Sequence, residues 1–215
     1  MAIEKDRRLV ENLRAWGVGR GALDVIEGDA LRVDWHGLFP RPTPDALRPA
    51  FRVIGNIPYQ ITSPLIEKAL TPPLPERIVF LVQREVADRL AAEPGSKAYG
   101  ALTVGVQASC RVERLFRVQP GSFRPPPTVE SAVIRLTPLA VPLVAPADRA
   151  ALRSFVVRCF SRRRKQLRNV VAHATGRTGA EVEAGLAALD LDPAARPEVL
   201  APAQFARLLH WSHQL

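Results

Sequence analysis

The pattern of apolar and polar positions predicts alternating strands and helices over residues 2–136. Strands are expected where short apolar runs are bounded by turn residues, and helices where apolar residues recur every three or four positions. The predicted strands are 2–4, 23–27, 51–55, 77–83, 112–118 and 131–136. The predicted helices are 6–16, 61–70, 84–92 and 101–110. This alternation is typical of an α/β domain, and the run "IVFLV" within 77–83 is expected at the centre of its sheet.

The composition changes after Pro138, first to Pro, Ala and Val and then to helical periods. Helices are predicted at 148–159, 162–174, 180–189 and 203–211. We therefore place a domain boundary at about Thr137–Ala147, with a first domain of residues 1–140 and a small all-helical domain of residues 141–215.

The bulk properties indicate a globular protein, which we expect to be cytoplasmic. With 215 residues, 47% of them hydrophobic, the chain can bury a sizeable core. Its apolar runs are far shorter than the roughly 20 residues that span a bilayer, and its charged N-terminus does not resemble a signal peptide. Cys110 and Cys159 are expected to be reduced structural thiols. The four histidines show no ligand spacing, so no metal site is predicted.

The charge indicates a polyanionic partner. The net charge is +9, and nine basic residues but no acidic one lie between Arg149 and Ala180. An arginine-rich composition alone explains a scattered excess of cations, but it does not explain a window of this length without a carboxylate. We therefore predict a localised basic surface that binds a polyanion.

Residues 56–59 read Asn-Ile-Pro-Tyr, directly after the predicted strand 51–55. The side-chain oxygen of Asn56 and the backbone carbonyl of Ile57, held outward by Pro58, can both accept hydrogen bonds from an amine. The ring of Tyr59 can lie against a flat base. At the carboxyl end of a strand, these groups predict an enzyme that methylates the exocyclic amine of a base.

A second informative segment is the loop "QPGSFRPPPTVE" at 119–130. Successive prolines stiffen a backbone by fixing φ near about −65°, so Phe123 is predicted to be presented on a rigid arm and to stack on a base. The alternative is a proline-rich turn with a core phenylalanine, which is favoured when the loop is taken alone. Because this loop occurs in the same chain as the Asn-Ile-Pro-Tyr tetrapeptide, the stacking role of Phe123 is favoured.

The chain resembles an rRNA adenine dimethyltransferase of the KsgA type over nearly all of its length. The segments that carry the resemblance are "AIEKD" at 2–6, "GDAL" at 28–31, "NIPYQITSPLI" at 56–66, "LVQREVADRL" at 81–90, "YGALTV" at 99–104, "FRPPPTVESAV" at 123–133, "FSRRRKQLRN" at 160–169 and "RPEVL" at 196–200. Singly, "NIPY" is moderately specific and "GDA" is weak. In this order and spacing the set is strong.

This resemblance implies an α/β fold, with a Rossmann-like class I methyltransferase sheet and a small C-terminal all-helical domain that binds rRNA. It also implies transfer of two methyl groups from S-adenosyl-L-methionine to the exocyclic amine of each of two adjacent adenosines. These adenosines lie near the 3′ end of small-subunit rRNA, and the reaction belongs to ribosome biogenesis. The expected partner is small-subunit rRNA or the small ribosomal subunit, with no membrane partner, and we expect a monomer.

The resemblance assigns roles to individual residues. It makes Asn56, Ile57, Pro58, Tyr59 and Phe123 catalytic, and Glu4, Asp29, Ala30 and Asn56 cofactor-binding. Glu4 would accept hydrogen bonds from the ribose hydroxyls of the cofactor, or alternatively be an acid at a helix N-terminus. Asp29 would accept from the adenine amine of the cofactor with Ala30 nearby, or alternatively belong to an ordinary Gly-Asp turn.

The basic segment is predicted to follow the RNA backbone. As a continuous helix it would place Arg158, Arg162, Lys165 and Asn169 on one face. The expected RNA-binding residues are Arg158, Arg162, Arg163, Arg164, Lys165 and Arg168. A solvated helix face without RNA contacts is the alternative.

The chain departs from the family pattern at its N-terminus. Family members carry, upstream of "AIEKD", a first strand and a glycine-rich turn that approaches the cofactor, and that strand would lie between the strands ending at Glu4 and Gly55. The glycines at 17, 19 and 21 are a poor substitute, because they leave a predicted helix and enter a strand. We therefore expect the 215-residue chain, taken literally, to be destabilised and impaired in cofactor binding.

Three other functions remain open from the sequence. The first is a large-subunit rRNA adenine methyltransferase of the antibiotic-resistance type, although the segments at 160–169 and 196–200 fit the small-subunit type better. The second is a non-catalytic rRNA-binding or ribosome-assembly factor. The third is a DNA amino-methyltransferase, for which no DNA-recognition segment is apparent.

Overall fold

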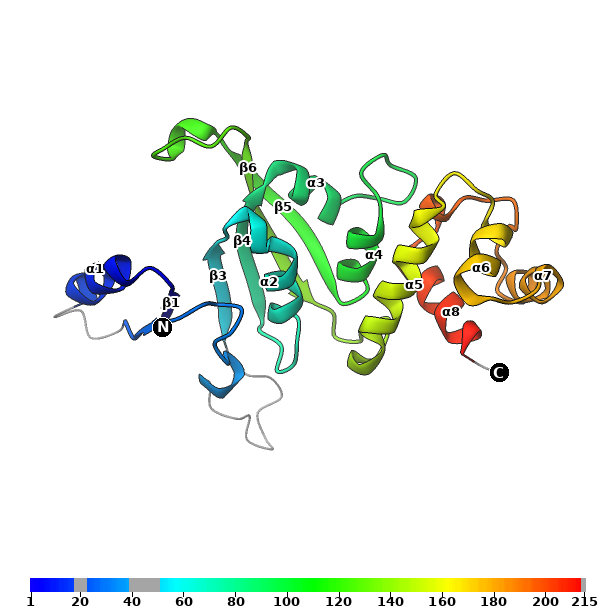
Figure 1. Cartoon of the computed structure of the whole chain (residues 1–215), viewed down its shortest axis with the longest axis horizontal. Coiled ribbons are helices and arrows are strands. Elements are labelled where there is room, and N and C mark those ends of the chain that lie inside the picture. Colours follow the sequence, from blue (N-terminus) through cyan, green and yellow to red (C-terminus); the bar gives the residue numbers. More distant parts are fainter. Residues whose placement is uncertain (18–22, 39–50, 214–215) are drawn as a thin grey trace.

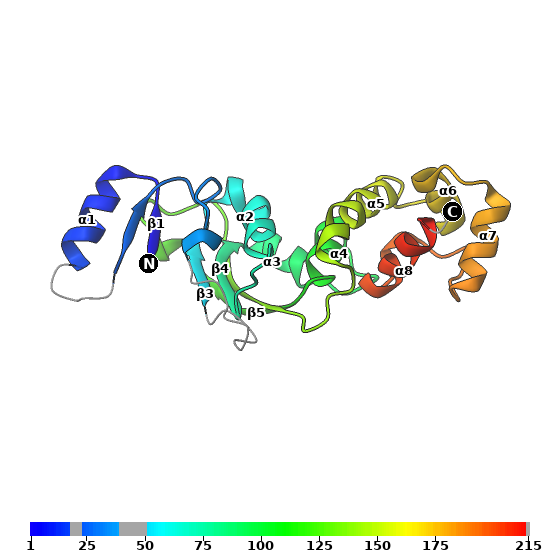
Figure 2. The ribbon, with the colours of Figure 1, turned by 90° about the horizontal axis from the view of Figure 1, so that it is seen from below.

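The structure is a computed structural model that describes residues 1–17, 23–38 and 51–213. Its elements form an elongated arrangement (Figure 1), with a small strand–helix unit at one end, a larger sheet in the middle and a group of helices at the other end. The same order is seen from below (Figure 2). The glycines at 19 and 21 lie outside the described residues.

The strands form two separate sheets. The first pairs β1 (Ala2–Glu4) with β2 (Val25–Glu27) in parallel. The second has four strands in the order β3 (Arg52–Asn56), β4 (Arg77–Gln83), β6 (Ser131–Pro138) and β5 (Cys110–Val118). Within it β3 and β4 are parallel, and the pairs β4–β6 and β5–β6 are antiparallel. The mixed sheet and its helices confirm the α/β class, and β4 is an inner strand as predicted.

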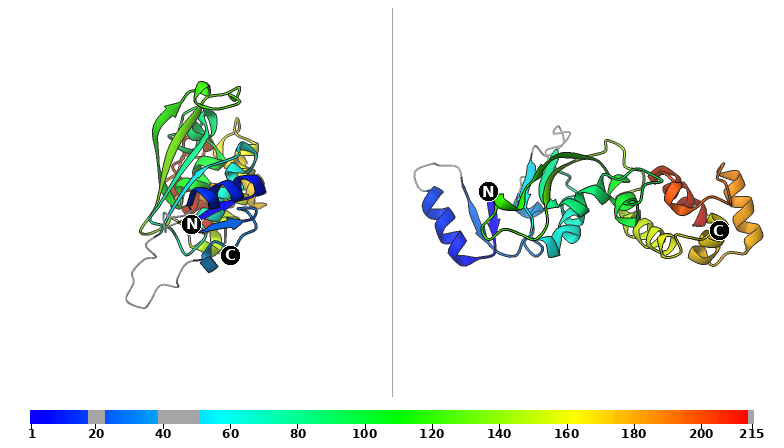
Figure 3. Two further views of the ribbon diagram at one scale, coloured as in Figure 1. Left: turned by 90° about the vertical axis from the view of Figure 1, so that its left-hand side faces the viewer. Right: turned by 90° about the horizontal axis from the view of Figure 1, so that it is seen from above.

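The strands β1 and β3 belong to different sheets and are not hydrogen-bonded to one another. The two sheets lie next to each other with β1 and β3 on the sides that face (Figures 1 and 3). The sequence predicts a further strand between these two edges, and that expectation stays a prediction.

Helices cover one face of the four-stranded sheet. They are α2 (Thr62–Ala69), α3 (Arg84–Leu90) and α4 (Ala101–Gln107), while α1 (Arg7–Gly17) packs on the small sheet. Buried residues of these helices, such as Leu65, Ile66 and Leu90, pack against Phe80 and Ile134 of the sheet. On β3 the side chain of Ile54 is 79% exposed, so the opposite face is open there among the described residues.

The C-terminal part is helical, as predicted. It consists of α5 (Arg149–Ser161), α6 (Leu167–Thr175), α7 (Gly179–Ala188) and α8 (Pro202–Ser212). Its core also takes in residues from before the predicted boundary. The fully buried Tyr99 donates from its hydroxyl to the carbonyl of Leu200 at 2.7 Å and packs near Phe160. Because Val104 lies in this core and Val106 in the sheet core, α4 joins the two.

The predicted helix 162–174 is wrong in its first part. Helix α5 ends at Ser161 and α6 begins at Leu167, and between them the amide of Lys165 donates to the carbonyl of Arg162 in a turn. Long-range bonds explain the break, because the amides of Leu167 and Arg168 donate to carbonyls of the segment 193–195. The expected common face of Arg158, Arg162, Lys165 and Asn169 therefore does not exist as a helix face.

Both cysteines are free and buried, as predicted. Burial raises the pKa of each thiol to about 12, so Cys110 and Cys159 stay protonated and packed. Of the helices that the structure describes, none has the length and apolar character needed to cross a membrane. In the same described ranges, no group of three or more His, Cys, Asp or Glu side chains is arranged to hold a metal ion.

Candidate active site

The carboxyl end of β3 presents the first group of predicted site residues. Asn56 pairs in register with Leu81 of β4, and the amide of Ile57 donates to the carbonyl of Leu81 at 3.1 Å. The side chain of Ile57 is buried, whereas Asn56 is exposed. Among the described residues, neither the side chain of Asn56 nor the carbonyl of Ile57 has a hydrogen-bonding partner, so both acceptors are available to a ligand.

A glycine allows this strand end to pack closely. A Cβ atom on Gly55 would lie 2.6 Å from Cδ1 of Ile57 and 3.5 Å from the ring of Phe80. A larger residue at position 55 would therefore force the terminal methyl group of Ile57 to shift. Gly55 thus keeps the tetrapeptide close against the sheet core.

Tyr59 begins a short 3-10 helix, Tyr59–Ile61, and its ring is half-buried. Its hydroxyl lies 2.9 Å from Oγ of Ser131, the first residue of β6. Ser131 pairs in register with Gln83 at the carboxyl end of β4. The hydrogen bond therefore joins the tetrapeptide to the base of the loop that carries Phe123.

Phe123 follows the 3-10 helix Pro120–Ser122 in the connection between β5 and β6, which projects beyond the top of the sheet (Figure 1). Its amide donates to the carbonyl of Pro120 at 3.1 Å, and its side chain is half-buried. At the end of the loop, the amide of Arg84 donates to the carbonyl of Glu130 at 2.9 Å, and the two side chains form an ion pair at 3.1 Å. Strand β5 ends and β6 begins beside the carboxyl end of β4. The loop that joins them, with Phe123, therefore lies at the same end of the sheet as Asn56.

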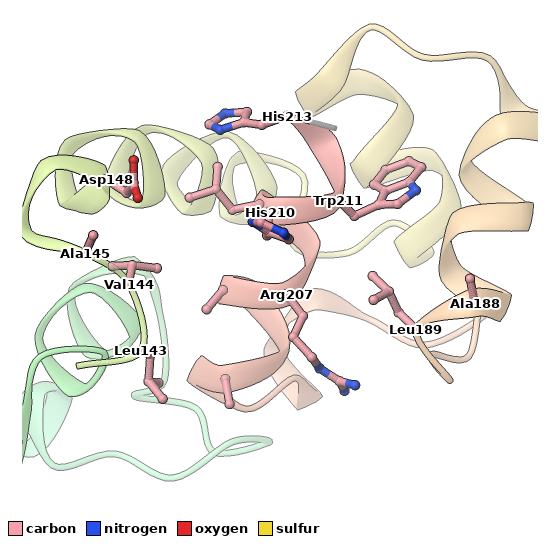
Figure 4. Close-up of a pocket in the computed structure, with 13 residues that line it drawn as sticks. Leu143, Val144, Ala145, Asp148, Ala188, Leu189, Arg207, His210, Trp211 and His213 are labelled. Atoms are coloured by element: carbon pink, nitrogen blue, oxygen red, sulfur yellow. The ribbon is translucent and has the colours of Figure 1, made fainter. Parts of the chain in front are cut away.

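Strand order places the five predicted catalytic residues at one end of the sheet, and the Tyr59–Ser131 bond connects the tetrapeptide with the loop. These residues are Asn56, Ile57, Pro58, Tyr59 and Phe123. Two prominent grooves of the described structure lie elsewhere. One, of about 740 Å³, follows α8 and is lined by Arg207, His210 and Trp211, among others (Figure 4). The other, of about 750 Å³, lies between α2, α4 and α5. Neither groove is lined by any of the five residues.

The predicted cofactor residues lie at the carboxyl ends of β1 and β2. One carboxylate oxygen of Glu4 accepts from the amides of Lys5 at 2.7 Å and Asp6 at 2.8 Å. Glu4 therefore does hold the start of the following helix, which was the alternative role. Its second oxygen has no partner among the described residues and remains able to accept a hydrogen bond.

Asp29 follows Gly28, whose amide donates to the carbonyl of Glu4 at 2.8 Å. One oxygen of Asp29 accepts from the amide of Leu31 at 2.9 Å, and the other lies 3.1 Å from Nζ of Lys5. The amide of Leu31 and the ammonium of Lys5 lower the pKa of Asp29, so the carboxylate is ionised at neutral pH. Lys5 thus links the two predicted cofactor residues.

Ala30 is held by Trp35, whose indole nitrogen donates to the carbonyl of Ala30 at 2.8 Å. Ribose hydroxyls and an adenine amine donate hydrogen bonds, and two carboxylates at the ends of adjacent parallel strands provide the acceptors that they require. Each carboxylate oxygen can accept a second hydrogen bond. The residues present therefore fit the nucleoside half of S-adenosylmethionine. No hydrogen bond or ion pair between described residues connects this group with Asn56.

The structure divides the predicted RNA-binding cations into two classes. Arg163 is engaged within the protein: its guanidinium lies 3.0 Å from a carboxylate oxygen of Glu198 and donates to the carbonyls of Ser96 and Lys97. Arg168 pairs with Glu183 at 3.4 Å. The other four predicted RNA-binding cations are exposed and make no side-chain hydrogen bond or ion pair with any described residue; they are Arg158, Arg162, Arg164 and Lys165.

Sequence reasoning missed three residues that hold this site in place: Ser131, Arg84 and Lys5. Ser131 and Arg84 lie within the segments 123–133 and 81–90, which carry the resemblance. Their residue types alone do not predict that Ser131 bonds to Tyr59, 72 residues away, or that Arg84 pairs with Glu130. Lys5 lies next to Glu4, and its reach to Asp29 depends on the pairing of β1 with β2.

Comparison with known proteins identifies the family of the chain. Residues 1–212 match the family model described as ribosomal RNA adenine dimethylase. "Ribosomal RNA small subunit methyltransferase A" of Hahella chejuensis is 45% identical over 208 residues, covering 96% of this chain and 72% of that protein. The protein of the same name from Idiomarina loihiensis is 41% identical over 210 residues, covering 97% and 68%.

Two solved structures are also similar. A dimethyladenosine transferase from Plasmodium falciparum has a TM-score of 0.78 and 27% identity, covering 96% of this chain and 78% of that one. The 23S rRNA methyltransferase ErmE has a TM-score of 0.68 and 27% identity, covering 99% and 81%. The sequence match over residues 1–212 and the shared fold show that the chain belongs to the ribosomal RNA adenine dimethylase family.

Proposed function

We propose that this chain dimethylates the exocyclic amine of two adjacent adenosines near the 3′ end of small-subunit rRNA, with S-adenosylmethionine as the methyl donor. The names of its relatives at 41–45% identity support the small subunit as the substrate. The observation that carries the chemistry is the end of β3, where two acceptors of Asn56 and Ile57 have no partner among the described residues and are followed in the chain by Tyr59.

Asn56 and Ile57 orient the target amine. An adenine amine is a poor nucleophile because its lone pair is delocalised into the ring. When Oδ1 of Asn56 and the carbonyl of Ile57 each accept a hydrogen bond from one N–H of this amine, a pyramidal nitrogen is favoured and its lone pair would be directed at the methyl group. The N–C bond would form as the bond from methyl carbon to sulfur breaks, and the methylated, positively charged nitrogen would then lose a proton to solvent. No strong base is required, since positioning supplies most of the rate enhancement.

Tyr59 and Phe123 hold the target base, one on each face. Taking a base out of its stack costs a few kcal/mol, and stacking on an aromatic side chain returns about 1–3 kcal/mol per base. Two rings therefore roughly offset the cost. Pro58 restricts the backbone conformation between the carbonyl of Ile57 and the ring of Tyr59.

Glu4 and Asp29, with Ala30 beside them, are the groups proposed to bind the nucleoside part of the cofactor. Glu4 would accept from ribose hydroxyls and Asp29 from the adenine amine. The bound cofactor supplies a methyl carbon that its sulfonium makes electrophilic. The expectation that the 215-residue chain binds it weakly remains to be measured by calorimetric titration.

We predict that Phe123→Ala weakens methyl transfer by about 1–3 kcal/mol, which is about 5- to 150-fold in rate, because one face of the base loses its stacking partner. Single-turnover transfer of tritiated methyl groups to unmethylated small subunits measures the effect and detects slow parent activity. The control is Phe116→Ala, since Phe116 is an exposed phenylalanine on β5. Equal rates for Phe123→Ala and the parent chain would rule out the stacking role.

The RNA-binding surface is proposed to use four exposed cations whose side chains have no partner in the part of the chain that the structure describes: Arg158, Arg162, Arg164 and Lys165. Each phosphate contact should contribute about 0.7–0.9 to the log–log slope of affinity against salt. Arg163 and Arg168 were also predicted to belong to this surface. Arg163 is held in a partly buried ion pair with Glu198, whereas the pair of Arg168 with Glu183 is exposed, so Arg168 keeps its proposed role. RNA shape and the flipped bases, rather than these cations, would supply specificity.

Arg164→Ala and Arg163→Ala are expected to change different quantities: the first the salt dependence of RNA binding, the second the free energy of unfolding. Arg164→Ala should lower the salt slope by about 0.7–0.9 and leave the unfolding temperature unchanged. Arg163→Ala should lower the free energy of unfolding by about 1–3 kcal/mol, because Glu198 loses its partner in a partly buried site. Filter binding to small-subunit rRNA at several salt concentrations, with thermal unfolding, separates the two. If the two variants changed the salt slope and the free energy of unfolding alike, the distinction between Arg163 and the exposed cation Arg164 would be refuted.

The structural likeness to ErmE keeps a large-subunit adenine as the second candidate substrate. Mapping the methylated base in both rRNAs after incubation with tritiated cofactor decides between them. We expect label in two adjacent adenosines of the small-subunit rRNA, and label confined to large-subunit rRNA would overturn this assignment. As working expectations, we also propose a cytoplasmic monomer built from a methyltransferase domain, residues 1–140, and an rRNA-binding domain, residues 141–215.

A further inference from the structure

The hydroxyl of Tyr59 and Oγ of Ser131 lie 2.9 Å apart although 72 residues separate them. Strand β4 lies between β3 and β6, so the backbones of β3 and β6 are about 10 Å apart. The side chain of Tyr59 therefore crosses the end of β4 to reach β6. This bond is a bridge between two chain segments rather than a contact between neighbours.

The bridge is well placed to restrain the ring of Tyr59. Ser131 is fully buried, and its hydroxyl has no other partner among the described residues. A buried hydroxyl without a partner is costly, so the bond is expected to persist. At its other end Tyr59 follows Pro58 and the anchored Ile57. The ring is thus held both at its backbone and at its hydroxyl.

The base of the Phe123 loop is fixed at the same place. Glu130, next to Ser131, accepts from the amide of Arg84 at 2.9 Å and forms an ion pair with its guanidinium. The first residue of β6 is therefore a rigid point from which the loop extends. The bond from Tyr59 to Ser131 therefore fixes the Tyr59 ring relative to the base of the loop that carries Phe123.

We infer that Ser131 is a positioning residue for methyl transfer: its hydroxyl fixes the plane of the Tyr59 ring and ties it to the base of the Phe123 loop. This rests on the proposed role of Tyr59 in stacking on the target adenine. Ser131 touches neither substrate nor cofactor. It acts by keeping the two rings at a set separation, which lowers the cost of ordering the site around the base.

The test is a double-mutant cycle with Tyr59→Phe and Ser131→Ala. Stacking is probed with an RNA hairpin that holds the two adjacent adenosines, one replaced by 2-aminopurine, whose fluorescence is quenched by stacking. Because 2-aminopurine has no amine at C6, rates are measured with unsubstituted, unmethylated small subunits. Each single variant should lose part of the quenching and lower the rate of methyl transfer at saturating RNA by about 5- to 20-fold, with unchanged RNA affinity. The double variant should be no worse than the single ones, because both remove the same bond.

Losses that multiply in the double variant, or full quenching and rate in Ser131→Ala, would overturn the inference. Ser131→Thr retains the hydroxyl and should restore most of the quenching. Tyr59→Phe breaks the bond from the half-buried side, so it keeps the test valid even if Ser131→Ala folds poorly. As a control, Thr103→Val removes another fully buried hydroxyl, on α4. It should lower stability without changing the quenching.

Tyr59→Ala distinguishes this inference from the proposed function. If Tyr59→Ala leaves the quenching intact, Tyr59 does not stack on the base and the proposed role itself fails. If Tyr59→Ala abolishes quenching while Ser131→Ala has no effect, the stacking role stands and only the positioning role of Ser131 is refuted.

Discussion

Replacing Asn56 by alanine is expected to lower the rate of methyl transfer by about 100- to 1000-fold, the loss typical of removing one preorganised hydrogen-bonding group from an active site. The side chain of Asn56 is exposed at the end of β3 and has no partner among the described residues. Its removal therefore leaves no internal group unsatisfied. The loss should appear in the rate at saturating RNA, with stability and RNA affinity close to those of the parent chain.

Gln60→Ala provides the matched control for this substitution. Gln60 is an exposed amide in the same short helix as Tyr59, and its truncation should leave the rate within about twofold, as for most surface changes. Single-turnover transfer of tritiated methyl groups to unmethylated small subunits measures both variants. If Asn56→Ala transferred methyl groups as fast as Gln60→Ala, the target amine would not be oriented by Asn56.

The second large effect is expected on stability, at Tyr99. Tyr99→Ala should lower the free energy of unfolding by about 3–5 kcal/mol, because it empties a fully buried aromatic site. Tyr99 lies in the loop before α4 but packs in the core of the C-terminal helices and donates to the carbonyl of Leu200. The α4 segment should therefore come loose from the helical part. Urea denaturation followed by circular dichroism measures the change.

Tyr99→Phe separates packing from hydrogen bonding at this position. It keeps the ring and removes only the bond to Leu200, which should cost about 1 kcal/mol. We also expect the parent chain to unfold in a single transition, since α4 contributes to both cores. Two independent transitions, or a loss below about 1 kcal/mol for Tyr99→Ala, would contradict the shared core.

Most strands and helices were predictable because each depends on a local pattern. The run at Arg77–Gln83 was predicted with its observed bounds, and the position of the tetrapeptide at the end of β3 followed from the apolar run before it. Periodicity is a local property, so it locates elements well when local and tertiary preferences agree. The fold class and the family resemblance could be read from the sequence for the same reason.

The break between α5 and α6 could not be predicted from local pattern. The segment 162–166 has good helix formers, but the amides of Leu167 and Arg168 are taken by the carbonyls of Ala195 and Pro193. Such long-range bonds override helix propensity. The same break changes the basic surface, because Arg163 turns toward Glu198 instead of solvent. A count of cations therefore does not show which of them are paired within the protein.

The candidate site was predictable in its exposed residues and not in its supports. Asn56, Tyr59 and Phe123 stand out because their residue types fit the chemistry of an amine on a flat base. Ser131 does not stand out, because its role depends on the order of β3, β4 and β6. The order of strands in a sheet is a property of the whole fold, so it cannot be read from the sequence of a single segment.

The most direct test of the site is a structure of the chain bound to an unmethylated small ribosomal subunit. We expect one adenine near the 3′ end of the rRNA to be flipped out and to lie between the rings of Tyr59 and Phe123. Its amine should be within hydrogen-bonding distance of Oδ1 of Asn56 and the carbonyl of Ile57. An adenine held in another place, such as the groove along α8, with Asn56 facing only solvent, would contradict the central claim.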